Sequence, residues 1–284
     1  MTIAISVKVH DGVVLAADSA TTLFSPNGGI SHVYNNANKI LNLYKSSEKK
    51  MDGLPIGIIT YGLGGIGNSS ISTLIKDFRK SLMNNEVKWK IDIDNYKIEE
   101  VANNFKKFIY EDTYKPFFKD NQQPPFLGFI IAGYSSKTDL AEEWRIEILN
   151  GECVGPTSVR KKEEVGITWG GESKTINRLV IGFDPLLTNI LKEMNFKDEQ
   201  IIPTLRFIQQ RTEAPIVPAA MPIQDAIDLA KFLVETTKNF TRFLPVAPTV
   251  GGPVEIATIT KHEGFKWIIR KHYFDNQFNP RWTK

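Results

Sequence analysis

The sequence predicts an α+β fold in which helices cover antiparallel sheets. Its expected strands and helices come in blocks: strands, two helices, a strand pair, further helices and a final strand hairpin. Strict one-by-one alternation would instead favour a doubly wound parallel sheet. With 284 residues, 42% of them hydrophobic, the chain is long enough to bury a sizeable core. Because no Pro-, Gly- or Ser-rich linker interrupts it, we expect a single domain over residues 1–284.

The first block opens with a strand hairpin. Residues 3–9 alternate Ile or Val with Ala, Ser or Lys, which is the two-residue period of a half-buried strand. His10, Asp11 and Gly12 have the composition of a tight turn, and residues 13–17 form a second, more apolar strand. The chain therefore enters the core of a sheet almost at its beginning.

A loop and two further strands complete this block. We expect a loop over residues 23–36 and strands over residues 39–44 and 55–61. A glycine-rich turn over residues 62–67 then leads into a helix that ends near Leu82. The turn matches the dinucleotide pattern G-x-G-x-x-G, but no acidic residue ends a strand about 20 residues later. We therefore expect no nicotinamide or flavin site there.

The second half of the chain contributes most of the helices. Apolar residues at helical spacing make the helix over residues 222–243 the clearest element of the chain. The other expected elements are a helix near 97–118, strands at 126–134 and 143–149, helices at about 173–183 and 186–210, and a hairpin over 254–260 and 265–270.

Composition excludes several classes of function. The net charge is only +3 and basic residues are interspersed with acidic ones, so we expect no nucleic-acid partner. No apolar run approaches a membrane span or a signal peptide, and Cys153 is the only cysteine. These features predict a cytoplasmic protein without a disulfide. The histidines are isolated and no nucleotide-binding loop occurs, so neither a metal nor a cofactor is expected.

Thr2 is the residue with the most distinctive chemical potential. A threonine hydroxyl is a poor nucleophile unless a base accepts its proton, and an N-terminal threonine carries such a base in its own α-amine. The reference pKa of an α-amine is about 7.7–8.0, so the amine is partly neutral at cellular pH. A lysine cation nearby would lower that pKa further. Small Thr in second place favours removal of Met1.

Residues 2–19 closely resemble the start of proteasome β subunits and of the peptidase of the bacterial two-component proteasome-like protease. The shared features are the initial Thr, an Asp-Gly turn and an Ala-Asp-Ser element that ends at Ser19. Lys39, followed by Ile, resembles the family's lysine at the start of its third strand, and Gly62 its glycine before the first long helix. Residues 251–260 are similar to its late glycine-rich turn and strand.

This resemblance implies a four-layer αββα sandwich, the N-terminal nucleophile (Ntn) hydrolase fold, with two antiparallel sheets between helix layers. It also implies roles for four residues. Thr2 would be nucleophile and base, Lys39 would tune the amine, Asp18 would orient Lys39, and the Gly62 N–H would donate to the oxyanion. The implied activity is that of a threonine-type endopeptidase or amide hydrolase.

The same resemblance implies how substrate and partners are bound. Thr21 and Thr22 would pair with the backbone of a peptide or polypeptide substrate, and the chain would form a ring-type homo-oligomer. An ATP-dependent unfoldase is a further possible partner of unknown identity. Two other functions stay open: a non-catalytic structural ring subunit of the same fold, and an amidase for small amides.

Two positions depart from the family pattern. Within residues 168–173, glycine stands where the family usually has a serine, beside a glycine, that contacts the nucleophile, unless Ser173 shifts into its place. The family's late Asp-x-x-Ser is also missing in register, with Thr249 as a partial substitute. These departures are the reason for keeping the non-catalytic alternative.

Overall fold

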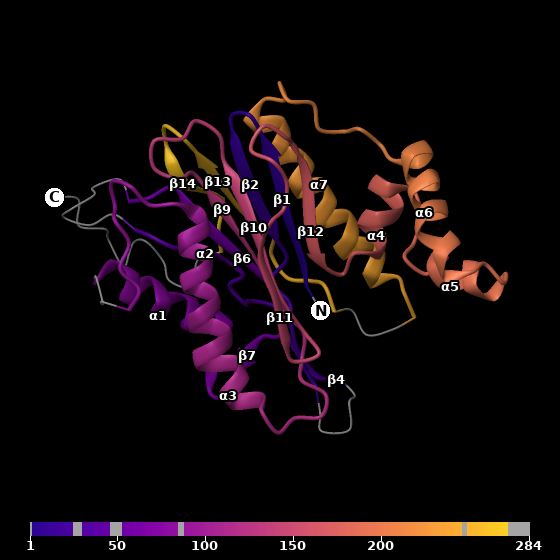
Figure 1. Ribbon diagram of the computed structural model, residues 1–284, viewed down its shortest axis with the longest axis horizontal. Helices are drawn as coiled ribbons and strands as arrows, with labels where there is room; N and C mark the ends of the chain where they lie inside the picture. The colour runs from indigo at the N-terminus through magenta and orange to yellow at the C-terminus, as the bar shows by residue number, and fades with distance from the viewer. Residues whose placement is uncertain (1, 25–29, 46–52, 85–87, 246–248, 272–284) are drawn as a thin grey trace.

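The computed structural model describes residues 2–24, 30–45, 53–84, 88–245 and 249–271. Two five-stranded sheets pack face to face, and helices cover the outer face of each (Figure 1). The predicted α+β sandwich, with antiparallel sheets between helix layers, is confirmed. Among the described residues, no helix combines the length and the apolar character needed to cross a bilayer.

The first sheet has the strand order β12-β1-β2-β13-β14, and every neighbouring pair is antiparallel. Its strands are β1 (Ile3–Val9), β2 (Gly12–Ala17), β12 (Gly166–Gly171), β13 (Glu255–Thr260) and β14 (Gly264–Ile269). The helices packed on its outer face are α4 (Lys174–Ile176), the π-helix η2 (Asn177–Ile181) and α7 (Ile223–Arg242). The predicted N-terminal hairpin is therefore in the centre of this sheet.

The second sheet has the order β11-β10-β9-β6-β5 and is also antiparallel throughout. Its strands are β5 (Ile40–Asn42), β6 (Ile56–Gly62), β9 (Leu127–Gly133), β10 (Glu142–Leu149) and β11 (Glu152–Ser158). Its outer face is covered by α1 (Ile71–Met83), α2 (Ile98–Lys106), the π-helix η1 (Lys107–Tyr114) and α3 (Lys115–Phe118). The predicted helix near 97–118 is thus one continuous run of three segments.

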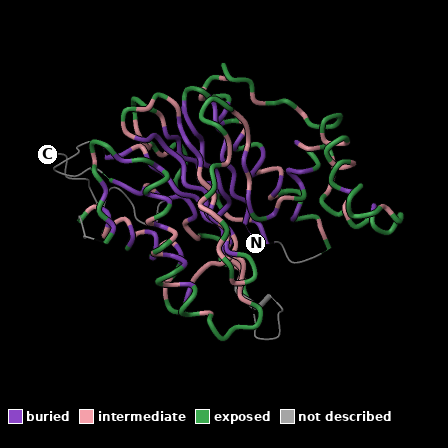
Figure 2. Tube along the Cα trace, in the orientation of Figure 1, coloured by how far each residue is buried: buried purple, intermediate pink, exposed green. Residues whose placement is uncertain are grey.

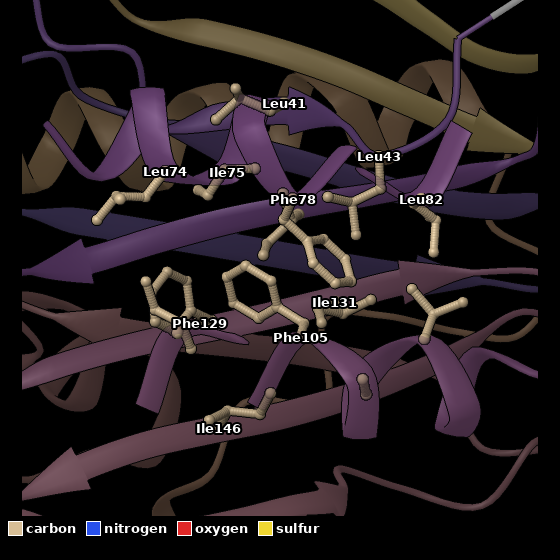
Figure 3. Close-up of a cluster of buried hydrophobic side chains, with 14 of the residues drawn as sticks. Leu41, Leu43, Leu74, Ile75, Phe78, Leu82, Phe105, Phe129, Ile131 and Ile146 are labelled. Atoms are coloured by element: carbon tan, nitrogen blue, oxygen red, sulfur yellow. The ribbon is translucent and has the colours of Figure 1, made fainter. Parts of the chain in front are cut away.

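An aromatic cluster fixes the helices on the second sheet. The ring of Phe105 lies 5.2 Å from that of Phe78 on α1 and 4.9 Å from that of Phe129 on β9, centroid to centroid (Figure 3). Both pairs are edge-to-face, a favourable arrangement for aromatic rings. Because all three side chains are fully buried, they join α1, α2 and the sheet into one packed layer.

Strand β1 differs from its prediction in one respect. Its alternation predicts one buried face, but all seven of its residues are buried. Ile3, Ile5 and the two valines pack under α7, whereas Ala4 packs against the second sheet. The second sheet therefore covers the face that the pattern assigns to solvent, and Figure 2 shows this buried centre as a continuous region.

Two predicted elements differ from the structure. The expected loop over residues 23–36 contains parts of a hairpin, β3 (Thr21–Phe24) and β4 (Ile30–Tyr34), and residues 25–29 lie outside the described part of the chain. The helix expected over 186–210 is two helices, α5 (Leu187–Glu193) and α6 (Asp198–Thr212). Asn195 between them has a φ of 63°, a left-handed conformation that ends a helix.

Candidate functional site

A cavity of about 440 Å³ opens beside the start of β1. Its wall is formed by Thr2, Thr21, residues 34–39, the end of β6 and the first turn of α1. Thr2 itself is only 3% exposed. Three residues that the sequence singled out, Thr2, Lys39 and Gly62, therefore face one cavity although they come from different parts of the chain.

A buried ion pair lies next to this cavity. The Nζ of Lys39 donates to the Oδ1 of Asp18 at 2.6 Å, and both side chains are almost fully buried, at 5% and 0% exposure. Asp18 follows the end of β2, and Lys39 directly precedes β5 in the other sheet. The pair therefore links the two sheets at the end of the sandwich where Thr2 lies.

The carboxylate of Asp18 is saturated with donors. Its Oδ1 also accepts from the backbone N–H of Ile3 at 3.0 Å, and its Oδ2 accepts from those of Ala20 and Gly251, each at 3.0 Å. Such hydrogen bonds hold an ionised carboxylate in one orientation. Asp18 thus fixes Lys39 and, through Ile3, the strand that follows Thr2.

The environment of Lys39 acts on its charge in two opposite directions. Burial lowers the pKa of the Lys39 amine because desolvation penalises the charged form, and the adjacent Asp18 carboxylate opposes that shift. The backbone of Lys39 is held as well, because its carbonyl accepts from the N–H of Thr60 at 3.0 Å. Lys39 is therefore a positioned amine on the cavity wall.

The end of β12 holds Thr2 in place. The N–H of Glu172 donates to the Thr2 carbonyl at 2.7 Å. Gly171 has a φ of +88°, and a Cβ there would lie 1.8 Å from the same carbonyl oxygen. Only glycine allows this close approach.

The glycine-rich turn is explained by packing. Gly62 ends β6 with a φ of +92°, and a Cβ there would lie 2.6 Å from the carbonyl oxygen of Phe126. A Cβ at Gly64 would lie 2.8 Å from the Oγ1 of Thr21. Strand β6 has antiparallel neighbours on both sides, so the parallel unit of a dinucleotide fold is not formed here.

The two threonines expected to bind substrate differ in position. Thr21 lines the cavity and lies opposite Tyr34 in the β3–β4 pair, and Tyr34 lines the cavity too. Thr22, opposite Val33, is not among the residues that line it.

The structure gives a physical reason for the glycine at position 170. A Cβ at Gly170 would lie 2.4 Å from the ring of Tyr61, and one at Gly128 would lie 2.2 Å from the same ring. The Tyr61 hydroxyl donates to the Oε1 of Glu147 at 2.8 Å. Burial and this carboxylate raise the pKa of the Tyr61 phenol, which keeps it a protonated donor. The tyrosine ring thus occupies the space that a serine at 170 would need.

Ser173 and Thr249 are the expected substitutes for the two serine-containing elements of the family pattern. Neither is among the described residues that form the cavity wall. Ser173 instead precedes α4, and Thr249 is buried.

We expect Gly170→Ala to lower the free energy of unfolding by about 1–3 kcal/mol, the usual cost of forcing an extra methyl group into a packed core. Gly251→Ala is the matched control, because a Cβ there would meet its nearest atom at 3.5 Å. Chemical denaturation of both variants measures the difference. Equal stability of the two would show that the Tyr61 ring moves aside without cost.

A second buried ion pair near the cavity has no counterpart among the residues predicted from sequence. The Nζ of Lys271, just past β14, lies 2.8 Å from the Oε2 of Glu255. It also donates to the Oγ of Ser19 at 2.7 Å and to the carbonyl of Ala37 at 2.8 Å. Lys271 therefore fastens the cavity wall that contains Ala37 to the first sheet. No sequence motif marks it, because its partners are distant in the chain.

The fold and the site define a class of protein: a layered α+β sandwich of two antiparallel sheets between helices, with a cavity at the start of its first central strand. Within that class, the chain is similar to solved structures of Anbu proteins. These include a Gly-1 mutant of Anbu from Hyphomicrobium sp. strain MC1, with a TM-score of 0.52, 13% identity, and coverage of 98% of this chain and 91% of that chain.

Two further structures agree with this result. Anbu, described as an ancestral beta-subunit, from Yersinia bercovieri has a TM-score of 0.50, 11% identity and coverage of 95% of this chain and 88% of that one. The helical assembly of the Anbu complex from Pseudomonas aeruginosa has a TM-score of 0.50, 14% identity, and coverage of 98% and 89%. At these identities the likeness establishes the fold alone. No protein-family model matches the chain, and no curated protein matches its sequence.

These findings correct one expectation. The sequence predicted a member of the proteasome β-subunit family or of the bacterial proteasome-type peptidases, and that assignment is wrong: the similar structures are Anbu proteins, a distinct family. The physical reason lies in what residues 2–19 do. They build the β1–β2 hairpin and place Asp18 at its end, as the fold requires, so their pattern follows the fold and does not identify the family.

Proposed function

We propose that this chain is an amide hydrolase that cleaves peptides or polypeptides, with Thr2 as its nucleophile after removal of Met1. One observation carries the proposal: Thr2 faces the same cavity as Lys39, and Lys39 is held by the buried carboxylate of Asp18. A hydroxyl, its own α-amine and a positioned lysine are the groups that an N-terminal nucleophile needs.

The proposed reaction has two steps: transfer of the substrate's acyl group to Thr2, and hydrolysis of the ester that results. The α-amine of Thr2 takes the proton from the Thr2 hydroxyl as the oxygen attacks the substrate's carbonyl carbon, and the Gly62 N–H donates to the oxyanion that forms. Collapse breaks the C–N bond, the proton passes to the leaving amine, and an ester to Thr2 remains. Water, deprotonated by the same α-amine, then attacks the ester and releases the carboxylic acid with a free hydroxyl on Thr2.

Lys39, Asp18 and the threonines of β3 have supporting roles in this proposal. A cationic Lys39 near the α-amine disfavours the ammonium form, so more of the amine is available as base. Asp18 keeps Lys39 oriented through the 2.6 Å contact. Thr21, on the cavity wall, would bind the substrate backbone, and Thr22 beside it would continue that contact.

The proposal includes self-association in the cytoplasm. The Anbu complex of Pseudomonas aeruginosa is a helical assembly, which supports a homo-oligomer for a chain of the same fold. An ATP-dependent unfoldase that delivers unfolded chains to such an assembly is a further partner in this proposal. Small amides are the alternative substrate class.

The test is the intact mass of the protein after treatment with an electrophile that bridges a vicinal N-terminal hydroxyl and amine. We expect a species that lacks Met1 and carries one adduct. Thr2→Ala removes the hydroxyl while keeping a small second residue, and it should lose Met1 without forming the adduct. Thr2→Ser keeps both reacting groups and should form it.

Two outcomes would reject the proposal. A chain that keeps Met1 and takes no adduct would indicate a non-catalytic subunit of this fold. An adduct that persists in Thr2→Ala would place the reactive group elsewhere.

A further inference from the structure

A second cavity, of about 570 Å³, opens where the edges of the two sheets meet. Its wall comes from β10, β11, β12 and the segment between the last two strands. Strands β11 and β12 are the edge strands of their sheets, so the cavity lies at the mouth of the sandwich. It is separate from the Thr2 cavity and shares no lining residue with it.

Arg145 on β10 lines this cavity without a carboxylate partner. Its Nη2 donates to the carbonyl of Trp169 at 3.0 Å, and its Nε is buried with no hydrogen-bond partner. Within the described part of the chain, no Asp or Glu oxygen lies within salt-bridge distance, 4.0 Å, of its guanidinium. A buried guanidinium N–H without an acceptor is costly, which points to an acceptor that a ligand supplies.

The neighbouring arginine differs from Arg145 in having a carboxylate within ion-pair distance. The Nε of Arg160 lies 2.8 Å from the Oε2 of Glu143, and its Nη2 contacts the Oγ1 of Thr168. The pair of Arg160 and Glu143 is therefore neutral as a unit. Arg145 lines the same cavity and has no carboxylate at that distance among the described residues.

A further buried cation lies beside the segment between β11 and β12, outside the cavity wall. Lys8, on β1, is 1% exposed, and its Nζ donates to the backbone carbonyls of Lys161 and Lys162 at 3.2 and 2.8 Å. No carboxylate of the described residues pairs with it at salt-bridge distance either. Carbonyl oxygens solvate this ammonium, and the nearby carboxylates of Glu143, Glu142 and Glu163 offset part of its charge, so Arg145 is the cation on which the site depends.

We propose that this cavity binds an oxyanion, a carboxylate or phosphate group, with Arg145 as its anchor. The planar guanidinium presents its N–H donors in a fixed fork that matches two oxygens of such a group. The Nε of Arg145 is the donor left free for it. Thr157, on the β11 side of the cavity, supplies a hydroxyl near the same mouth.

Isothermal titration of the full-length protein with inorganic phosphate, and separately with acetate, tests this site at constant ionic strength. We expect saturable binding of at least one of the two anions, and the comparison distinguishes a phosphate from a carboxylate ligand. Arg145→Met should weaken that binding by about tenfold or more, because a charge-assisted hydrogen-bonded contact is lost. Thr157→Val leaves the guanidinium in place and should weaken it by a smaller factor.

Arg211→Met is the matched control. Arg211 is an exposed arginine on α6, stacked on the ring of Phe207, so its removal changes the net charge equally without touching the cavity. Binding should be unchanged in this variant. No saturable binding of either anion would overturn the proposal. So would equal binding by the Arg145→Met and wild-type proteins, or equal weakening in Arg211→Met. If Arg145→Met does not fold, unchanged binding by Thr157→Val and Arg145→Lys together would overturn it.

Discussion

Thr2→Ala is expected to reduce the rate of amide hydrolysis by at least about a thousandfold. The proposed mechanism routes both bond-forming steps through the Thr2 oxygen, and no second hydroxyl near it carries an adjacent α-amine. Loss of a nucleophile typically leaves only the residual catalysis due to substrate binding and oxyanion stabilisation. The measurement is the release of a fluorophore from a panel of peptide amides by wild-type and variant protein.

Thr2→Ser is the control for this experiment. It keeps the hydroxyl and the amine, so it should retain a measurable part of the wild-type rate, whereas a merely structural role of Thr2 would affect both variants alike. Wild-type rates in Thr2→Ala would contradict the assignment of the nucleophile. Turnover of small amides with no cleavage of longer peptides would retain Thr2 and select the amidase alternative.

The second large effect is expected at Asp18. Asp18→Ala should lower the free energy of unfolding by about 3–5 kcal/mol, because it leaves the buried Lys39 ammonium without its counter-ion. It also removes the acceptor of the backbone N–H groups of Ile3, Ala20 and Gly251. Amide hydrolysis should fall with it, since Lys39 loses its orientation. Denaturant unfolding and the fluorogenic assay measure the two effects.

A double-mutant cycle isolates the ion pair. Lys39→Met removes the cation, so Asp18→Ala and Lys39→Met together should cost less than the sum of the two single changes. Asp112→Ala is the surface control: Asp112 pairs with Lys88, and both side chains are well exposed, so its loss should have little effect. Strict additivity of the two buried changes would show that the 2.6 Å contact contributes no coupling.

Part of the fold follows from local pattern. The two-residue alternation over residues 3–9 predicts β1, and the Asp-Gly turn predicts its hairpin with β2, because side chains of a strand point alternately to opposite faces. The apolar spacing of residues 222–243 likewise predicts α7, which the structure places at Ile223–Arg242. The order of these blocks predicts antiparallel sheets with helices outside.

Other local predictions failed where local pattern does not decide the structure. Residues 21–24 and 30–34 have no clear alternation, and they pair as β3 and β4. The helix pattern over 186–210 continues through Asn195, whose left-handed conformation separates α5 from α6. The family assignment failed because a hairpin pattern that the fold itself demands is shared more widely than one family.

The sequence by itself determined the class of fold and singled out Thr2, Asp18, Lys39 and Gly62 as chemically notable residues. Only the tertiary structure decided that Asp18 and Lys39 meet across the two sheets, that Tyr61 fills the space beside Gly170, and that Arg145 faces a cavity without a carboxylate. The physical reason is the distance along the chain over which each of these features acts. Side-chain periodicity sets which face of an element is buried, whereas strand order and register decide which distant residues are brought together.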